Sequence, residues 1–250
     1  MSEFVTISEA NNVVRVHLNR PQKRNALTQD MYAAMTQALQ DAEARDDIAA
    51  VVLSGEGDLF CAGNDLGDFL KHGELKSDSP VFQFLQTISS VNVTVVAAVQ
   101  GTAVGIGTTI LLHCDLVYAA EGTHFVMPFV DMGLVPEAGS SQLISALCGH
   151  AKAAELLLLA EQIDAAKAYE YNIVNKVVPA NELAATVQAV ADKLAAKPVR
   201  SLRLSKKLMK TQPEPINDRI QRELVDFLKV LASPETQAII AAKASSTARQ

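Results

Sequence analysis

The sequence predicts an α/β fold in which strands and helices alternate along the first part of the chain and helices fill the last third. Short runs of β-branched and apolar residues recur, separated by segments with helical spacing. Beyond about residue 140 the chain becomes rich in alanine and leucine at helical spacing. The 250 residues, of which 49% are hydrophobic, suffice for a substantial core and exclude a disordered or collagen-like chain.

The first half of the chain is expected to begin with two paired strands. Residues 4–8 and 13–18 alternate polar and apolar side chains on either side of a polar turn, which is typical of a β-hairpin. Thr28 is suited to cap the helix that follows, because apolar residues then recur at helical spacing. A further helix is predicted over residues 104–112. Three more strands are predicted, at 49–53, 93–99 and 116–119.

The last third is predicted to be mostly helical, with one short strand at 175–178. Asp164 and Ser233 are placed as N-caps of two of its helices. A boundary near residue 197 divides an expected core, residues 1–197, from a helical appendage, residues 198–250, suited to packing on a neighbouring copy. The sequence has no glycine- and serine-rich linker of the kind that would separate two independent domains.

Charge and cysteine content exclude several function classes. The net charge of −6 opposes binding to nucleic acid or to an anionic membrane. Cys61, Cys114 and Cys148 lack the paired spacing of a zinc site, so we expect no metal and a reducing, cytoplasmic environment. No secretory signal is visible at the N-terminus. Residues 79–114 carry no charged side chain, but Asn92, Gln100 and three glycines divide this stretch, and its part 93–99 reads as a buried strand of a sheet rather than as a membrane helix.

Two of the predicted strands end in glycine-bearing turns. One turn leads into residues 60–66 and the other into residues 102–107. Turns of this kind leave backbone N–H groups unpaired, and two that converge would form an oxyanion hole, although ordinary turn chemistry is the alternative. The pair Gly105 and Gly107 lacks the third glycine of a dinucleotide-binding fingerprint, so no nicotinamide cofactor is indicated.

An ordered set of motifs resembles the crotonase, or enoyl-CoA hydratase/isomerase, superfamily over roughly residues 3–200. The motifs are Asn19-Arg-Pro, Arg24-Asn-Ala-Leu, Phe60-Cys-Ala-Gly-Asn-Asp-Leu, Ala98-Val-Gln-Gly-Thr-Ala-Val-Gly-Ile-Gly, Cys114-Asp-Leu-Val-Tyr-Ala, Pro128-Phe and Gly133-Leu-Val-Pro-Glu-Ala-Gly. The resemblance implies a crotonase-like spiral of strand-strand-helix repeats with a helical C-terminal part. It also implies a homotrimer or dimer of trimers and an acyl-CoA thioester as ligand. Coenzyme A then enters within the substrate, and no separate cofactor is implied.

The resemblance assigns roles to residues at matching positions. It implies that the backbone N–H groups of Asn64 and Ile106 form the oxyanion hole, although many relatives have glycine at the position of Ile106. For Lys23 and Arg24 it implies contacts with the CoA phosphates, with ordinary surface charge as the alternative. The full set implied to contact the acyl-CoA is Lys23, Arg24, Ala26, Ala62, Gly63, Asn64, Asp65, Leu66 and Phe129.

The acidic residues distinguish between branches of the family. Resembling hydratases place two glutamates where this chain has Thr109 and Phe129, neither of which can activate water, so hydration is disfavoured. Glu137 matches the lone catalytic base of the 3,2-enoyl-CoA isomerases; a solvated loop acid is the alternative. Phe129 would form an apolar wall that excludes water and makes the base stronger.

We therefore expect an isomerase of fatty acid metabolism that converts 3-enoyl-CoA to 2-trans-enoyl-CoA. The alternatives are a hydratase that uses Glu137 and Asp131, a hydrolase or decarboxylase on the same scaffold, and a non-catalytic acyl-CoA binding module. Cys61 has no base paired with it in the sequence and is not expected to be a nucleophile. Residues 68–80 are expected to form a polar loop over the acyl pocket. Four basic residues form a stripe along one predicted helix: Arg200, Arg203, Lys207 and Lys210. The stripe could bind the CoA ribose phosphate, or it could be an ordinary solvated helix face.

Overall fold

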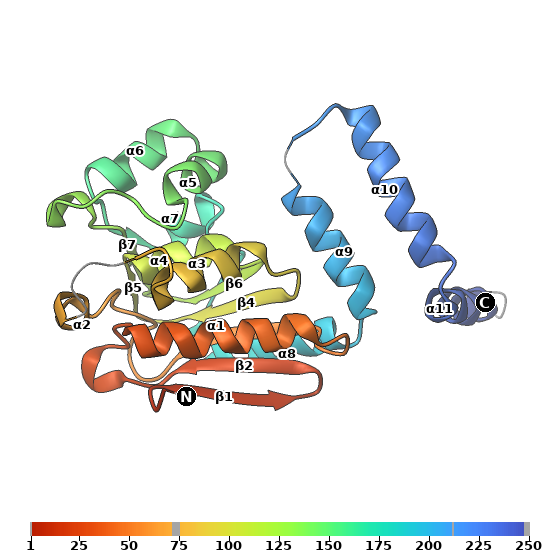
Figure 1. The fold of residues 1–250 in the computed structure, drawn as a ribbon, viewed down its shortest axis with the longest axis horizontal. Coiled ribbons are helices and arrows are strands. Elements are labelled where there is room, and N and C mark those ends of the chain that lie inside the picture. The colour runs from red at the N-terminus through yellow and green to blue at the C-terminus, as the bar shows by residue number, and fades with distance from the viewer. Residues whose placement is uncertain (1, 72–75, 212, 248–250) are drawn as a thin grey trace.

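A computed structural model describes residues 2–71, 76–211 and 213–247 of the chain (Figure 1). The strands are β1 (Val5–Ala10), β2 (Val13–Leu18), β3 (Ala50–Gly55), β4 (Thr94–Val99), β5 (Thr102–Val104), β6 (Leu116–Ala120), β7 (His124–Val126), β8 (Ile163–Asp164) and β9 (Lys176–Val178). The α-helices are α1 (Gln29–Ala44), α2 (Leu66–Lys71), α3 (Pro80–Ser90), α4 (Ile106–Thr109), α5 (Ser140–Cys148), α6 (His150–Leu158), α7 (Ala165–Glu170), α8 (Leu183–Ala195), α9 (Val199–Lys210), α10 (Ile216–Leu231) and α11 (Pro234–Thr247). Four short 3₁₀ turns are η1 (Pro21–Lys23), η2 (Ile110–His113), η3 (Val130–Met132) and η4 (Ala180–Glu182).

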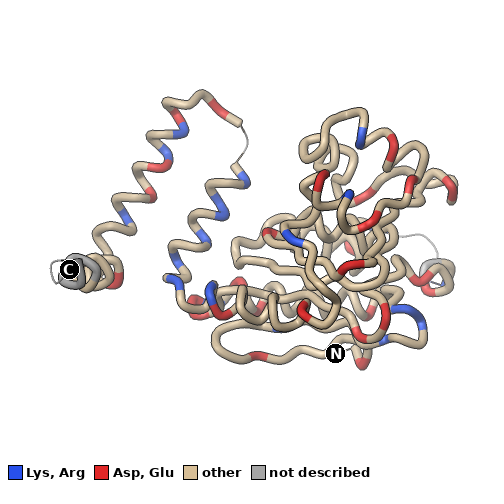
Figure 2. The backbone as a smooth tube through the Cα atoms, turned by 180° about the vertical axis from the view of Figure 1, so that it is seen from behind, with Lys and Arg blue, Asp and Glu red and all other residues tan. Residues whose placement is uncertain are grey.

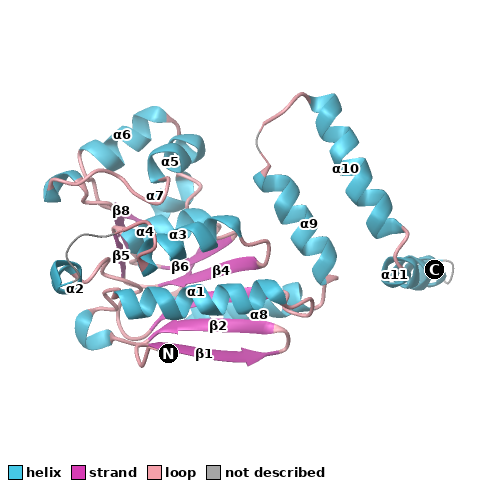
Figure 3. Ribbon diagram, viewed as in Figure 1, coloured by secondary structure: helices cyan, strands magenta, loops and turns pink. Residues whose placement is uncertain are grey.

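The main sheet has the strand order β1-β2-β3-β4-β6-β9, with β1 antiparallel to β2 and the other pairs parallel. Its central strands β3 and β4 are buried along almost their whole length, as expected of parallel strands covered on both faces. Side chains alternate between those faces: Val51 and Leu53 pack in the core with α1 and α3, whereas Ala50 and Val52 pack against α8. Figure 3 shows α1 and α8 on opposite sides of the sheet.

The predicted α/β class is confirmed, and several local predictions agree with the structure. The first two strands form the expected hairpin, and residue 13 pairs with residue 10 at its turn. Thr28 accepts a hydrogen bond from the Met31 N–H at the start of α1, and Asp164 accepts one from the Lys167 N–H at the start of α7. These caps satisfy N–H groups that the first turn of a helix leaves unpaired.

The helix predicted over 104–112 is wrong in its extent. Thr102–Val104 is strand β5, which pairs with β7 in a second, three-stranded sheet of order β5-β7-β8. Gly105 then adopts φ 55° and ψ −118°, so the helix starts only at Ile106 and changes to the 3₁₀ turn η2 after Thr109. The backbone of Val104 is already paired with a neighbouring strand, and that pairing prevails over the local helical pattern.

The loop expected over 68–80 is replaced in part by helices. Residues 66–71 form α2, and α3 begins at Pro80, where proline suits the first turn of a helix. Residues 72–75 of the expected loop lie outside the described residues. Among the helices of the described ranges, none combines the length and the apolar character that crossing a bilayer requires.

The C-terminal helices stand beside the sheet layer rather than within it (Figure 1). Basic residues recur along α9, whereas α10 carries both signs of charge (Figure 2). The prediction of a solvated basic face is wrong for Arg203. Its guanidinium donates to four backbone carbonyl groups near the end of α1: those of Ala42, Glu43, Arg45 and Ile48.

Lys206, one turn from Arg203, also joins α9 to the core. Its side chain is only 5% exposed, and its Nζ lies 2.7 Å from Asp115 Oδ2 and donates to the Val93 carbonyl at 2.7 Å. The same Asp115 oxygen accepts from the Val95 N–H. Two cations of α9 are therefore committed to structural contacts. The division of the chain into 1–197 and 198–250 stays a prediction.

Candidate active site

The two glycine-bearing turns lie directly against each other. The Cys61 N–H donates to the Thr102 carbonyl at 3.2 Å, and the Val104 N–H donates to the Cys61 carbonyl at 2.9 Å. A Cβ at Gly107 would lie 2.7 Å from the Cys61 carbonyl oxygen, so a larger residue would push the turns apart. Gly63 adopts φ +94°, a conformation that favours glycine. The fold thus brings together the segments that carry Asn64 and Ile106.

Both predicted oxyanion donors, Asn64 and Ile106, carry a backbone N–H group that has no protein acceptor among the residues that the structure describes. For Ile106 the reason is its place as the first residue of α4, where intrahelical acceptors do not reach. Such groups can donate to a bound oxygen.

Asn64 is fixed from two directions. Its backbone forms a parallel bridge with Leu27, in which the Leu27 N–H donates to Gly63 and the Asp65 N–H donates to Leu27. Its side-chain oxygen accepts a hydrogen bond from the Tyr32 hydroxyl at 2.5 Å. Tyr32 is completely buried, which raises its pKa well above 10, so the hydroxyl stays a donor.

The chain after Asn64 is held by an ion pair. The Arg20 guanidinium lies 2.7 Å from Asp65 Oδ2 and donates to the Ala26 carbonyl at 2.9 Å. The hydrogen bond from Arg20 to the Asp65 carboxylate lowers the pKa of Asp65, and a second hydrogen bond, from the Asp68 N–H, lowers it further. The carboxylate of Asp65, which the sequence analysis placed in the acyl-CoA contact set, is therefore committed to protein partners.

Asn25 explains why the Arg24-Asn-Ala-Leu motif lies beside this turn. Its buried side chain accepts a hydrogen bond from the Arg20 N–H. Its amide nitrogen lies within hydrogen-bond distance of three carbonyl oxygens of the opposite loop: those of Glu56, Leu59 and Phe60. The first loop of the chain is thus joined to the turn that precedes Asn64.

Glu137 lies beside the second turn, where Thr109 donates a hydrogen bond to its carboxylate. The Thr109 hydroxyl is 2.5 Å from Glu137 Oε1. Burial raises the pKa of Glu137 above its usual 4.5, while the hydrogen bond from Thr109 opposes part of this shift. Tyr32 is near enough for the charge of Glu137 to contribute to its raised pKa, after burial and Cys61. Glu137 therefore lies against α4, which follows the second turn, and within electrostatic range of Tyr32, which contacts Asn64 after the first turn.

Thr109 is the residue of this site that the sequence analysis missed. It was interpreted only as a lost hydratase acid, yet it is fully buried and bonded to the surviving carboxylate. A signal was present, because a hydroxyl in a predicted buried helix needs an acceptor. The spacing to Glu137 along the chain could not identify which acceptor.

The remaining predicted contact residues differ in exposure. Phe129 is 7% exposed and belongs to the same buried cluster as Cys61 and Ile106. Lys23 and Arg24 are exposed on the loop after β2. Ala26 and Ala62 are half-buried, Gly63 is buried, and Leu66 is 55% exposed. Their roles toward acyl-CoA stay predictions.

Two other candidates have surroundings that argue against chemistry. Cys61 is fully buried, which raises its pKa to about 12 and keeps it as a thiol. Asp131 lies in the short turn η3 and is exposed. A nucleophilic cysteine or a second buried acid is therefore not supported at these positions.

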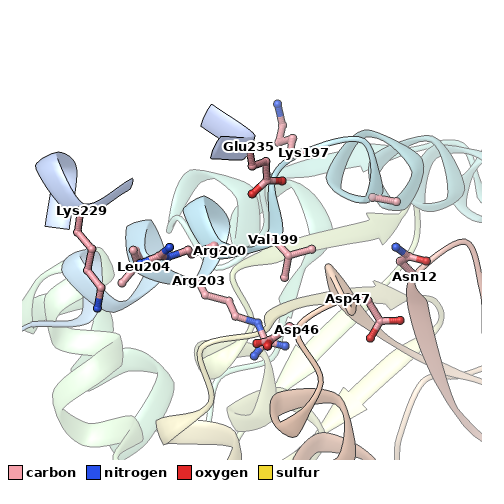
Figure 4. Close-up of a pocket in the computed structure, with 11 residues that line it drawn as sticks. Asn12, Asp46, Asp47, Lys197, Val199, Arg200, Arg203, Leu204, Lys229 and Glu235 are labelled. Carbon is pink, nitrogen blue, oxygen red and sulfur yellow. The ribbon is translucent and has the colours of Figure 1, made fainter. Parts of the chain in front are cut away.

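A separate hollow of about 730 Å³ lies between the end of α1 and the C-terminal helices (Figure 4). Both signs of charge line it, including Asp46, Asp47, Arg200 and Lys229. Arg203 also reaches this hollow, but its guanidinium is already bound to carbonyl groups of the core. Arg200 and Arg203 of the basic stripe line it, but none of the residues from Lys23 to Phe129 that the family resemblance implies to contact acyl-CoA does.

Comparison with known proteins decides the family. A family model described as enoyl-CoA hydratase/isomerase matches residues 8–238. The chain belongs to this family. The resemblance to the crotonase superfamily and the expectation of its fold are thereby confirmed. A solved structure described as a putative enoyl-CoA hydratase/carnithine racemase from Magnetospirillum magneticum AMB-1 is 46% identical, with a TM-score of 0.94 over 98% of this chain and 97% of that one.

Curated relatives in the enoyl-CoA hydratase/isomerase family include proteins of different named activities. The 1,2-epoxyphenylacetyl-CoA isomerase of Escherichia coli (strain K12) is 34% identical over 82% of this chain and 81% of the relative. Enoyl-CoA delta isomerase 2 of Rattus norvegicus is 33% identical over 84% of this chain and 55% of the relative. Membership therefore shows an enoyl-CoA hydratase/isomerase relationship without choosing between these reactions.

Proposed function

We propose that the protein is an enoyl-CoA isomerase that converts a 3-enoyl-CoA thioester to the 2-trans-enoyl-CoA in fatty acid metabolism. The observation that carries this proposal is the hydrogen bond from Thr109 to Glu137. It places a single carboxylate beside the second glycine turn, where a threonine occupies the position of a hydratase acid. One acid can move a proton, whereas the family's hydration mechanism needs two acids to activate water.

The proposed reaction uses Glu137 as both base and acid. Its carboxylate removes a proton from C2 of the substrate, and the electron pair of the broken C–H bond forms a dienolate with its negative charge on the thioester oxygen. Glu137 then returns the proton to C4, which leaves the double bond between C2 and C3. No atom is gained or lost in this sequence of steps, so it consumes neither water nor an oxidant or reductant.

The backbone N–H groups of Asn64 and Ile106 are proposed to donate to the thioester oxygen. These hydrogen bonds stabilise the dienolate more than the substrate, because the thioester oxygen carries more negative charge in the dienolate. A single donor of this kind contributes about 10²–10³ to the rate in other enzymes. The close contact between the two turns supports this role, since it limits how far apart the donors can move.

The raised pKa of Glu137 supports its role as base. A carboxylate that is partly desolvated attracts a proton more strongly than one in water. Phe129, a buried residue of the same hydrophobic core as Ile106, is proposed to exclude water from the reacting atoms. Exposed Lys23 and Arg24 are proposed to meet the CoA phosphates at the protein surface.

We further propose that the chain assembles as a homotrimer or a dimer of trimers through its C-terminal helices. Large apolar side chains of α10 are exposed in the single chain: Ile216, Ile220, Leu224, Val225, Phe227 and Leu228. An exposed apolar helix face of this kind marks a protein contact. Light scattering coupled to size-exclusion chromatography would give three or six times 26.8 kDa, and a monomer would contradict the proposal.

The function is tested by mixing the protein with a 3-enoyl-CoA and following the ultraviolet absorbance of the conjugated 2-enoyl thioester. We expect the chromophore to appear with wild-type protein and its rate to fall about 10²–10⁴-fold in Glu137→Gln, which keeps an acceptor for Thr109 but cannot act as a base. A parallel assay offers 2-enoyl-CoA. Consumption of that thioester would indicate a hydratase, and binding of both thioesters without turnover would indicate a binding module.

A further inference from the structure

The loop that carries Glu137 is attached at two points to one short helical segment, α4 with η2. Thr109 donates to the Glu137 carboxylate, and the His113 Nε2 lies 2.8 Å from the Ala138 carbonyl oxygen. The two side chains thus reach consecutive residues of the loop from one helical segment. Ile106 begins that segment. A single element therefore carries one proposed oxyanion donor and both supports of the proposed base.

The backbone that follows Glu137 has an unusual conformation that needs external support. Ala138 has φ 53° and Gly139 has φ 68°, two consecutive residues in the left-handed region. A residue with a side chain adopts this conformation rarely, and surrounding contacts must maintain it. Within the loop, the Ser140 N–H donates to the Glu137 carbonyl at 2.9 Å. From outside the loop, His113 contacts the Ala138 carbonyl.

The protonation state of His113 suits a hydrogen-bond donor. Burial lowers its pKa below 6.5; the hydrogen bond to Ala138 opposes this shift, and the nearby charges of Lys210 and Lys206 add to it. The ring is therefore neutral near pH 7. A carbonyl oxygen can only accept, so the one ring hydrogen must lie on Nε2.

We propose that His113 is a positioning residue for Glu137. Its Nε2–H fixes the Ala138 carbonyl, and this fixes the direction in which the Glu137 side chain leaves the backbone relative to the Ile106 N–H. The inference rests on the proposed function, in which Glu137 must reach C2 and C4 of one bound substrate. A small displacement of a catalytic group can reduce a rate by as much as 10²-fold.

The test compares His113→Leu, which removes the donor, with His113→Gln, whose amide N–H can reach the same carbonyl. A matched control, His150→Leu, makes the same change at an exposed histidine of α6. Each variant is assayed for kcat and KM with a 3-enoyl-CoA. Amide hydrogen exchange of residues 134–143 is measured in the same samples by mass spectrometry, without substrate.

We expect His113→Leu to lower kcat about tenfold, to leave KM within about twofold, and to speed exchange of residues 134–143. His113→Gln restores both properties, and His150→Leu changes neither. Unchanged hydrogen exchange in His113→Leu overturns the positioning role. A His113→Gln variant that exchanges like the wild type but keeps the low kcat of His113→Leu overturns it as well. Absence of wild-type turnover overturns the proposed function instead, because the exchange measurement does not depend on catalysis.

Discussion

Replacing Thr109 by valine tests the contact that defines the candidate base. The change keeps the shape of a fully buried side chain and removes only the hydroxyl that donates to Glu137 at 2.5 Å. A hydrogen bond to a charged group contributes about 1.5–3 kcal/mol, and a buried acceptor without its donor costs a similar amount. We therefore expect a loss of about 1–3 kcal/mol in the free energy of unfolding at pH 7.

The loss should depend on pH. Burial already raises the pKa of Glu137 in the folded protein, so its contribution to stability is greatest below pH 4.5 and declines as pH rises through the raised pKa. The Thr109 hydroxyl favours the ionised form, so its removal raises the pKa further. The destabilisation by Thr109→Val should consequently be larger at pH 7 than at pH 4, and the acid limb of kcat/KM should move to higher pH.

Denaturant unfolding at the two pH values and a pH profile of the 3-enoyl-CoA assay measure these effects. Thr108→Val is the matched control, because the Thr108 hydroxyl is equally buried but donates to the Ala103 carbonyl at 2.7 Å. The control should lose similar stability at both pH values and keep the acid limb in place. An unshifted acid limb together with pH-independent destabilisation in Thr109→Val would refute the proposed link between Thr109 and the ionisation of Glu137.

Three further substitutions test the framework around the site. Gly107→Ala places a Cβ 2.7 Å from the Cys61 carbonyl oxygen, so kcat should fall by at least tenfold; wild-type kcat in a folded variant would show that the contact between the turns is not needed. Lys206→Met removes the cation paired with the mostly buried Asp115 carboxylate, which keeps only its hydrogen bond from the Val95 N–H, and should cost about 3 kcal/mol in denaturant unfolding; a loss below about 1 kcal/mol would contradict this contact. Asp65 has a lowered pKa, so its contribution to stability is present above its unfolded pKa and lost as pH falls through the folded one. Asp65→Asn should therefore reduce the acid dependence of stability and raise KM for acyl-CoA, and an unaltered acid dependence would count against the Arg20 pairing.

The elements with a strong local pattern could be predicted from the sequence. Val51, Val52 and their neighbours form a continuous apolar run because β3 is covered on both faces, and Thr28 and Asp164 cap helices through bonds within a few residues. Strand β5 was missed since its pairing with β7 depends on residues more than twenty positions away. Local propensity in such a segment is weaker than the sheet contacts that override it.

The candidate site could be predicted only in outline. The glycines indicated two exposed-backbone turns, and family resemblance indicated Glu137, but neither indicated the partner of its carboxylate. Thr109 and Glu137 are 28 residues apart, and Arg203 and Ala42 are 161 apart, so no periodic pattern connects them. Arg203 is therefore predicted to belong to a basic surface stripe, although its guanidinium binds carbonyl groups at and just after the end of α1.

The central claim is that one carboxylate, Glu137, carries the proton from C2 to C4. Its most direct test uses a 3-enoyl-CoA labelled with deuterium at C2, a single turnover in ordinary water, and mass spectrometry of the 2-enoyl product. A lone buried base predicts deuterium at C4 in part of the product, and no such transfer with Glu137→Gln. A product from wild-type protein whose new C4 hydrogen comes entirely from water would contradict the account, because a separate group would then have donated it.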